Sequence, residues 1–445
     1  MGLLDKFRPK WQHSDWQVRL ESLEELTDQP TLARLAAKDP EQRVRLACLD
    51  RISDESMLAQ VAGSAQDPLV RSRAVVRLTD QAAIAGFVKT DPERMVRQAA
   101  LDVCNDQPLL FSIATSDPDL PLRKAAAGRL VEQKLLAKLF EHSSDWEVRQ
   151  EAVGNLQDEE LLIDIAKTEK TATTRQRATA RLDDQFILGD IARNDRDMAV
   201  RVTAIGRLQD EAILEELLRD DPNRDIRLAA VRRVSSLDAI GNAARGDKSD
   251  EVRIAAVERI EDQAVLGSIA RTDRISDVRM AAVMKLRDQD VLAKVAVEDS
   301  REIVREAAVW LLDDDALLKR ICMTDVHAEV RMAACECIRD PQLLAEIARD
   351  CLDPAVQLQA VKELADGHQL LAVALSSTDS DVQRAAAMRI TDDVLLGELA
   401  CQSTQAELGS YATRRISDRT VLEHVKGNGG TYEARKEAGT KLKGE

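Results

Sequence analysis

The sequence predicts an all-α protein, an α-solenoid built from about seventeen tandem helix-turn-helix repeats. Three observations predict it: a repeat period of 26 residues, two apolar helical stripes in each repeat, and helix-start residues at fixed offsets. The period is marked by an Arg that usually follows an apolar residue and recurs without insertion. This marker Arg is found at Arg19, Arg45, Arg71, Arg97, Arg123, Arg149, Arg175, Arg201, Arg227, Arg253, Arg279, Arg305 and Arg331, and its phase continues through Gln357, Gln383 and Gly409 to Arg435.

The first helix of each repeat is indicated by apolar residues at positions −1, +3, +4 and +7, counted from the marker Arg as zero. At 100° per residue these positions form one stripe that faces a core. We expect this helix to be the longer of the two and to begin at an Asp at position −6, which several repeats follow with Pro. In the repeat that starts at Asp247, the four apolar residues are Val252, Ala256, Val257 and Ile260.

The second helix is indicated by an Asp at position +9, which can accept the first free backbone N–H groups of a helix. In the same repeat Asp262 has this position, and the apolar residues that follow are Leu266, Ile269 and Ala270. A helix pair this short cannot bury its apolar faces alone, so the repeats must stack and share one continuous core. We therefore expect an N-terminal capping segment over residues 1–12 with a short helix at Gly2–Phe7, a continuous solenoid over 13–426, and a C-terminal capping helix within 427–445.

The repeat resembles a known family. Its spacing of an Asp, five residues and an Arg, as from Asp247 to Arg253 and from Asp273 to Arg279, with the run VRxAAVxxL, resembles HEAT repeats, in particular the short bacterial HEAT-like type found in phycobilin lyases. The resemblance covers essentially the whole chain and implies a binding scaffold. It also implies two alternatives: a chromophore-lyase-like role with a bound tetrapyrrole, or an action on DNA like that of the HEAT-like alkylpurine DNA glycosylases.

Composition disfavours nucleic acid as the partner. The chain has 63 Lys and Arg against 79 Asp and Glu, a net charge of −16, so as a whole it repels nucleic acid and anionic membranes at long range. Aromatic residues make up 2% and offer few platforms for stacking bases. No apolar run is long enough to span a bilayer, and the start MGLLDKFRPK is too short and too charged for a secretory signal, so we expect a cytoplasmic protein.

The marker Arg row has two interpretations. Its side chains lie close to the core stripe, where a guanidinium needs a carboxylate partner, and the repeated Asp residues can supply one. A row of guanidinium groups could instead follow a phosphate backbone, because the Arg fork matches carboxylates and phosphates alike. The geometry favours a structural ladder between repeats, represented by Asp247, Arg253, Asp273, Arg279, Asp299 and Arg305.

A second basic row stands at position +6, on the flank of the first helix. Each member precedes the +9 Asp, where one is present, by three residues, a spacing suited to a surface ion pair. The alternative is that the row binds an anionic ligand such as nucleic acid. The row consists of Arg51, Arg77, Arg129, Arg181, Arg207, Arg233, Arg259, Lys285, Arg389 and Arg415.

Position +5 points away from the core and is therefore free to carry function. Small residues occupy it in four consecutive repeats, Gly128, Gly154, Ala180 and Gly206, although Gly in a helix costs up to about 1 kcal/mol relative to Ala. A groove that accepts a partner's backbone would explain them, but crowding on the inner side of a tight superhelix, or sequence drift, is the favoured interpretation.

An apolar patch is predicted further along the same position. Met284 and Trp310 stand at +5 in consecutive repeats, with Met280 and Met332 at +1, which we expect to be nearly as exposed. Exposed Met-rich patches suit adaptable protein contacts. The patch therefore predicts a protein interface; self-association or sequence drift are the alternatives.

Cys322, Cys335, Cys337 and Cys351, with His327 nearby, are the one group that resembles a metal site, but they lack the paired spacing of zinc ligands, and buried Cys behaves as a small apolar residue. No catalytic constellation, phosphate loop or cofactor motif is present. The sequence thus predicts a non-enzymatic scaffold without a cofactor, which binds a protein partner through the exposed face of the longer helices.

Overall fold

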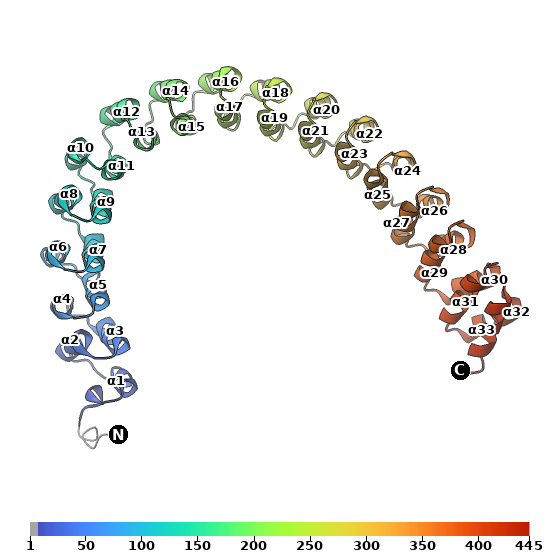
Figure 1. Ribbon diagram of the computed structural model, residues 1–445, viewed down its shortest axis with the longest axis horizontal. Helices are drawn as coiled ribbons and strands as arrows, with labels where there is room; N and C mark the ends of the chain where they lie inside the picture. The colour runs from blue at the N-terminus through green and yellow to red at the C-terminus, as the bar shows by residue number, and fades with distance from the viewer. Residues whose placement is uncertain (1–7, 445) are drawn as a thin grey trace. The chain divides into compact units, whose positions relative to one another are not determined.

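The computed structural model describes residues 8–444, and the chain divides into two compact units, Met1–Asp210 and Glu211–Glu445. Between residues 8 and 444 every regular element is a helix, which confirms the all-α prediction (Figure 1). The predicted capping helix at Gly2–Phe7 lies outside the described residues, and the prediction of one continuous body over 13–426 stays a prediction. The two units are taken in turn.

The first unit begins with a short 3-10 helix, which seven and a half helix pairs follow. The guanidinium of Arg34 lies 5.1 Å from the ring centre of Trp11 in this 3-10 helix. Its elements are η2 (Lys10–Gln12), α1 (Trp16–Ser22), α2 (Gln29–Lys38), α3 (Gln42–Arg51), α4 (Glu55–Ser64), α5 (Pro68–Val75), α6 (Gln81–Thr90), α7 (Arg94–Val103), α8 (Gln107–Ser116), α9 (Leu120–Arg129), α10 (Gln133–His142), α11 (Trp146–Asn155), α12 (Glu159–Thr168), α13 (Ala172–Thr179), α14 (Gln185–Asn194) and α15 (Met198–Arg207).

The second unit continues the same alternation. Its elements are α16 (Glu211–Asp220), α17 (Arg224–Val231), α18 (Leu237–Gly246), α19 (Asp250–Val257), α20 (Gln263–Thr272), α21 (Ser276–Val283), α22 (Gln289–Glu298), α23 (Glu302–Val309), α24 (Asp315–Thr324), α25 (Ala328–Cys337), α26 (Pro341–Asp350), α27 (Pro354–Glu363), α28 (Gly367–Ser376), α29 (Ser380–Arg389), α30 (Asp393–Gln402), α31 (Ala406–Arg415), α32 (Arg419–Asn428) and α33 (Tyr432–Lys441).

The first helix of each repeat carries an odd number and the second an even number. Within each unit, successive odd helices pack on one another and form one layer, while the even helices form the other layer (Figure 1). Each 26-residue repeat is therefore one helix pair stacked on the next. Each unit is an α-solenoid of stacked helix pairs, as the repeat pattern predicts.

The prediction that the first helix is the longer one is wrong. Helix α19 has 8 residues, whereas α20 has 10. The reason is the Asp at position −6, which does not begin the first helix. Asp247 instead ends α18 in extended backbone, and its Oδ1 accepts the N–H of Ser249 at 2.8 Å, so the first helix starts only after Ser249.

The start signal of the second helix is confirmed. Asp262 is the N-cap of α20, and its side chain accepts the N–H groups of Ala264 and Val265. The same side-chain cap is made by Asp28, Asp54, Asp80, Asp106, Asp158, Asp184, Asp288, Asp314, Asp340, Asp366, Asp392 and Asp418.

The predicted core positions are buried. Val252, Ala256 and Val257 have no exposed surface, and Ile260 is 5% exposed. The +3 Ala is fully buried in every repeat that has one, which marks the place where neighbouring helices approach most closely. These residues are Ala74, Ala100, Ala126, Ala152, Ala178, Ala204, Ala230, Ala256, Ala282, Ala308, Ala334, Ala360, Ala386, Ala412 and Ala438.

Helix α33 closes the second unit by packing on α31 and α32. The break before it comes later than position 427, because α32 runs to Asn428. The N–H of Gly430 then donates to the carbonyl of Ala400 at 3.0 Å, and a Cβ at this position would stand 2.5 Å from the carbonyl oxygen of Ser403. Only Gly permits this close approach of two backbones.

Candidate functional site

The marker Arg joins three segments of neighbouring repeats. Arg253 donates from Nε and Nη2 to the two carboxylate oxygens of Asp273, at 2.7 and 3.0 Å, and from Nη1 to the carbonyl oxygen of Asp247 at 2.8 Å. The two side chains are 3% and 7% exposed. Arg279 pairs in the same way with Asp299, and Arg305 with Asp325. The Asp at position −6, which the sequence analysis predicts to cap the first helix, is thus the ion-pair partner of the marker Arg of the preceding repeat.

In two repeats that lack a carboxylate at position −6, the marker Arg of the preceding repeat pairs with an Asp at position −4 instead. Arg45 pairs with Asp67 at 2.6 Å, and Arg331 pairs with Asp353; both Asp residues stand two positions later in the repeat. The hydrogen bond from Arg45 holds the pKa of Asp67 below its usual value, and the hydrogen bond from Arg331 does the same for Asp353. These guanidinium groups are engaged in contacts between repeats.

The +6 row has a different partner from the one expected, so its interpretation as surface pairs with the +9 Asp is corrected. Arg415 donates to the carbonyl oxygens of Ala387 and Ile390, both at 2.7 Å, at the end of the preceding first helix. The last carbonyls of a helix lack partners within it and carry partial negative charge. The +6 cation therefore caps the C-terminus of the helix one repeat earlier. The same type of contact is made by Arg51, Arg77, Arg129, Arg181, Arg207, Arg259, Lys285 and Arg389.

Two residues missed in the sequence extend this line of caps. Asn155 donates to the carbonyls of Gly128 and Leu130 at 2.8 and 2.9 Å, and Lys441 donates to those of Arg414 and Ile416 at 2.7 and 2.6 Å. Both stand at position +6 of their repeats. A donor at that position, charged or not, is the signal that could have found them.

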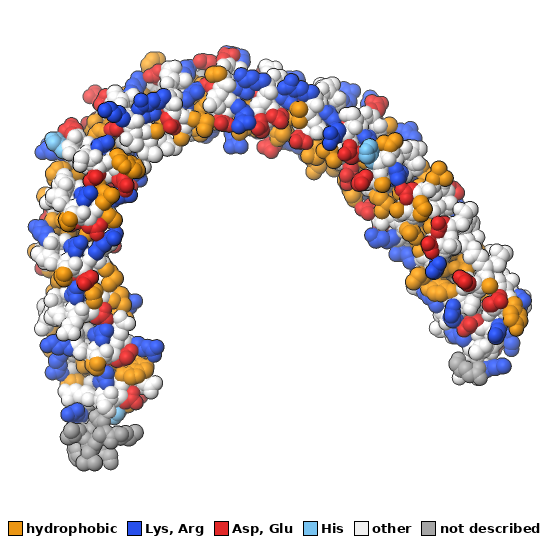
Figure 2. All heavy atoms as spheres, in the orientation of Figure 1, with side chains coloured by type: hydrophobic (Ala, Val, Ile, Leu, Met, Phe, Trp, Pro, Cys, Tyr) orange, Lys and Arg blue, Asp and Glu red, His pale blue; other side chains and the backbone are white. Residues whose placement is uncertain are grey.

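The predicted apolar patch is only partly exposed. Met284 and Trp310 end consecutive first helices, α21 and α23, and are 64% and 51% exposed. Met280 and Met332 are half-buried, so the expectation that position +1 is nearly as exposed is wrong for them. Ile303 on α23 adds an exposed side chain that the sequence analysis overlooked. Figure 2 shows apolar side chains along the edge of the second unit over α21 and α23.

Three of the four small residues at position +5 lie together on the surface of the first unit. Gly128, Gly154 and Ala180 line a shallow hollow of about 250 Å³ with Arg177 and Glu151, whereas Gly206 is not part of it. Crowding does not explain these glycines. A Cβ at Gly206 would meet nothing within 4 Å, and at Gly154 it would meet only the flexible side chain of Arg177, at 3.4 Å.

The cysteines near His327 lie mostly in the core. Cys322, Cys335 and Cys351 are buried, and Cys337 is half-buried. A hydrogen bond with Cys322 and burial raise the pKa of the Cys335 thiol, and burial raises that of Cys351, so these groups stay protonated at neutral pH. Within residues 8–444 no group of three His, Cys, Asp or Glu side chains is placed to hold a metal ion.

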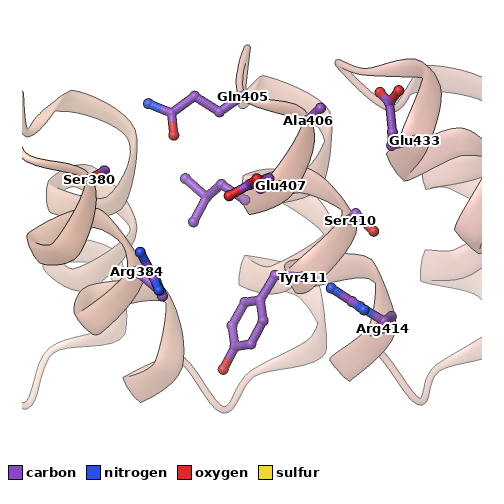
Figure 3. Close-up of a pocket in the computed structure, with 10 residues that line it drawn as sticks. Ser380, Arg384, Gln405, Ala406, Glu407, Ser410, Tyr411, Arg414 and Glu433 are labelled. Atoms are coloured by element: carbon purple, nitrogen blue, oxygen red, sulfur yellow. The ribbon is translucent and has the colours of Figure 1, made fainter.

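A further hollow of about 490 Å³ lies on the first-helix side near the end of the second unit (Figure 3). It is lined by Arg384 of α29 and by Glu407, Tyr411 and Arg414 of α31. Arg384 pairs with Asp381 at 3.0 Å, so cations and carboxylates of this surface partly neutralise each other. The sequence analysis did not predict this hollow.

No family model matches the sequence, and no curated protein matches it. Among solved structures, the chain is similar to YibA of Escherichia coli, at 20% identity over 68% of this chain and 99% of that one, with a TM-score of 0.25. It is also similar to importin beta, at 13% identity over 96% and 70% of the chains and a TM-score of 0.30. A third similar structure is the Cnd3–Cnd2 subcomplex of S. pombe condensin, at 12% identity over 96% and 74% and a TM-score of 0.24. These likenesses are weak, and what those proteins bind is a property of those proteins.

Among the described residues, no helix is both long and apolar enough to cross a membrane.

Proposed function

We propose that the chain is a non-enzymatic scaffold that binds a protein partner through the exposed face of its first helices, the odd-numbered ones. One observation carries the proposal: Met284 and Trp310, both more than half exposed, end two first helices that pack on each other. Large apolar side chains that stay more than half exposed on consecutive repeats are typical of interaction surfaces, and Trp in particular is typical of interface hot spots. In the first unit, the hollow lined by Gly128, Gly154 and Ala180 is a second place where a partner's backbone can approach the first helices closely.

Nucleic acid is the weaker alternative. The +6 row, which would have to hold the phosphates, is engaged by backbone carbonyls across the repeats, as for Arg415, Arg389 and Arg181. Releasing these groups would uncap the helices, and the net charge of −16 opposes approach of a polyanion. No feature of the described residues favours a bound tetrapyrrole, so we do not propose a lyase-like role.

The test compares three forms of the tagged protein purified from its own cells: the wild type, the double variant Met284→Asp/Trp310→Ala, and the control Met388→Asp. Met388 occupies the same +5 position in another repeat and is 58% exposed, so it tests for a general effect of a charge on this face. A partner identified by mass spectrometry is then produced separately, and its affinity for each form is measured by isothermal titration calorimetry.

We expect the partner to bind the wild type and the Met388→Asp control equally, and to bind the double variant at least tenfold more weakly. Equal affinity for all three forms would contradict a role of the patch. Nucleic acid carried by all three forms, with binding that falls steeply as salt rises, would favour the alternative instead.

A further inference from the structure

The exposed face of four consecutive first helices, α19, α21, α23 and α25, is acidic. Within its bounds each of these helices has a single cation, its marker Arg. Each also carries at least one carboxylate that is exposed or half-exposed. These are Glu251 on α19, Asp277 on α21, Glu302 and Glu306 on α23, and Glu329 and Glu336 on α25.

The marker Arg residues do not neutralise this face, because their side chains are buried between the repeats and paired with Asp residues there. The side chains of Arg253, Arg279 and Arg305 are no more than 9% exposed, and each is paired with the Asp of the next repeat. At the edges of the face, Arg224 pairs with Glu251 at 2.8 Å and Arg301 stands 3.8 Å from Glu302.

The other carboxylates of this face have no such neighbour. Among the described residues, no Lys or Arg nitrogen comes within 4.0 Å of the carboxylates of Asp277, Glu306, Glu329 or Glu336. Four carboxylates on one surface of three consecutive first helices therefore lack an ion pair, and the carboxylate of Glu336 accepts a hydrogen bond from Gln359 at 3.0 Å.

Apolar side chains lie among these carboxylates. Met284 and Trp310 are the largest, and Ile303, 36% exposed, precedes Trp310 by two helical turns on α23. Figure 2 shows acidic and apolar side chains alternating along this edge of the second unit. The surface thus combines an apolar centre with a negatively charged surround, the pattern of a specific interface with a polar rim.

The first helices of the other unit show that the fold does not require this charge. There the exposed positions of α3, α5, α7 and α9 carry additional cations, Arg43, Arg73, Arg94 and Lys124. Position −2 holds Arg43 in one repeat and Asp277 in another, and position +1 holds Lys124 in one and Glu306 in another, so these positions can carry either charge. The acidic character of α19 to α25 is a property of those repeats and calls for a reason other than folding.

We propose that the face formed by α19, α21, α23 and α25 docks a basic amphipathic helix of a partner protein. The proposal rests on the scaffold function proposed above and names the chemistry of its partner. Apolar residues of the partner would pack on Met284 and Trp310, and Lys or Arg residues on its flanks would meet the carboxylates. With helices packed about 8–10 Å apart, four of them span about 30 Å, the length of about 20 residues of helix.

The test uses a fluorescein-labelled 20-residue amphipathic peptide of Leu and Lys as its probe, with fluorescence anisotropy as the measurement. Two control peptides separate the contributions: one with Glu in place of every Lys, and one with Ser in place of every Leu. Three forms of the full chain are compared with the wild type: Met284→Asp/Trp310→Ala, Glu306→Lys/Glu336→Lys, and the control Asp50→Lys/Asp102→Lys, which changes two exposed carboxylates on the first helices α3 and α7. Circular dichroism and thermal unfolding check that each variant is folded, and Asp277→Lys/Glu329→Lys replaces the second variant if that one unfolds.

We expect the Leu/Lys peptide to bind the wild type and the Asp50→Lys/Asp102→Lys control with equal Kd, and each of the other two variants at least tenfold more weakly. Its affinity should also fall as salt rises, because exposed charges are screened. The Leu/Glu and Lys/Ser peptides should bind at least tenfold more weakly than the Leu/Lys peptide.

The inference is overturned if the Leu/Glu peptide binds as tightly as the Leu/Lys peptide, if the Lys/Ser peptide does so, or if the Glu306→Lys/Glu336→Lys variant binds like the wild type. These failures are distinct from failure of the scaffold function. A captured partner that is lost with Met284→Asp/Trp310→Ala but kept with Glu306→Lys/Glu336→Lys would preserve the scaffold and reject a basic partner.

Discussion

Two stretches of the second unit hold neighbouring repeats together with different side-chain contacts. Between α19 and α25, each contact between repeats holds a buried ion pair, as between Arg253 and Asp273. At α29 the marker position is Gln383, whose Nε2 donates to the carbonyl of Ser377 at 2.7 Å and whose Oε1 accepts from Gln405 at 2.7 Å. The bond to the carbonyl at −6 is kept in both stretches, while the charge pair is not.

The comparison shows which contact of the residue at the marker position occurs in both stretches. A donor that reaches the −6 carbonyl ties the first helix to the end of the preceding second helix, and an amide does this as an Arg does. The ion pair is an addition to this bond: where Gln383 replaces Arg, the position 20 residues later is Ser403 rather than Asp. A buried carboxylate without its guanidinium would be costly, which explains why no Asp stands at position 403 once the Arg is absent at position 383.

The largest expected effect is therefore the loss of one partner alone. Arg253→Met leaves the Asp273 carboxylate buried and without its cation, which should lower the free energy of unfolding by about 3–5 kcal/mol. Gln383→Met removes neutral hydrogen bonds and should cost about 1 kcal/mol. Urea unfolding followed by circular dichroism measures both. Equal losses for the two variants would show that the charge adds nothing to the cost.

The cost of overpacking a helix crossing should not depend on whether the neighbouring contact between repeats is an ion pair or an amide hydrogen bond. Ala256, in the charged stretch, and Ala386, in the amide stretch, are both fully buried at position +3. Ala256→Leu and Ala386→Leu should each overpack the helix crossing and cost about 1–3 kcal/mol. Their unfolding midpoints in urea check this. A cost for one Leu variant that greatly exceeds the other would mean that the two stretches also differ in how tightly the helices cross.

Acid should separate the stretches again, with a smaller effect. The hydrogen bond from Arg331 lowers the pKa of Asp353; burial acts to raise the pKa of Asp325, but the hydrogen bond from Arg305 and other contacts outweigh it and the pKa is lowered. A depressed carboxylate pKa adds stability that is present above the usual value near 3.8 and is lost as pH falls through the folded-state pKa.

Hydrogen exchange with mass spectrometry, at pH 6 and near pH 3, measures this loss helix by helix. After correction for the intrinsic exchange rate, protection of α23 and α25 should fall more than protection of α29 and α31. An equal fall in both pairs of helices would contradict the assignment of the acid effect to the ion pairs.

The sequence predicts the parts of this fold that depend on neighbours along the chain. The core stripe of Val252, Ala256 and Val257 and the cap at Asp262 follow from helical spacing and local hydrogen bonds, and they are found as expected. Asp247 was assigned to the wrong helix end because an Asp before a helix has the same local pattern whether it caps that helix or pairs with an Arg 20 residues earlier.

The candidate site was harder to predict for the same reason. Whether Met280 is exposed depends on how the next repeat covers it, and position +1 is half-covered where +5 is open, as at Met284. The partners of the +6 cations lie 25 to 28 residues back along the chain, beyond any helical period. Contacts between repeats need the geometry of stacking, which the period alone does not supply.

The smallest expected effect concerns those +6 cations, and here the two stretches should agree. Arg415 and Arg259 each donate to two carbonyls at the end of the preceding first helix, one in the amide stretch and one in the charged stretch. Removing either by an Ala substitution gives up two hydrogen bonds at a helix end that water can reach, so each should cost only about 0.5–1.5 kcal/mol in urea unfolding.

Lys is the sharper variant at Arg415, because the chain already uses it: Lys441 reaches two carbonyls from the same position, at 2.7 and 2.6 Å. Arg415→Lys should therefore keep most of the stability that Arg415→Ala loses. If Lys and Ala at this position were equally destabilising, the flat guanidinium rather than a cation at the helix end would be the requirement. If neither changed stability, the +6 row would be free of its capping role, and binding an anionic ligand would again be the better explanation for it.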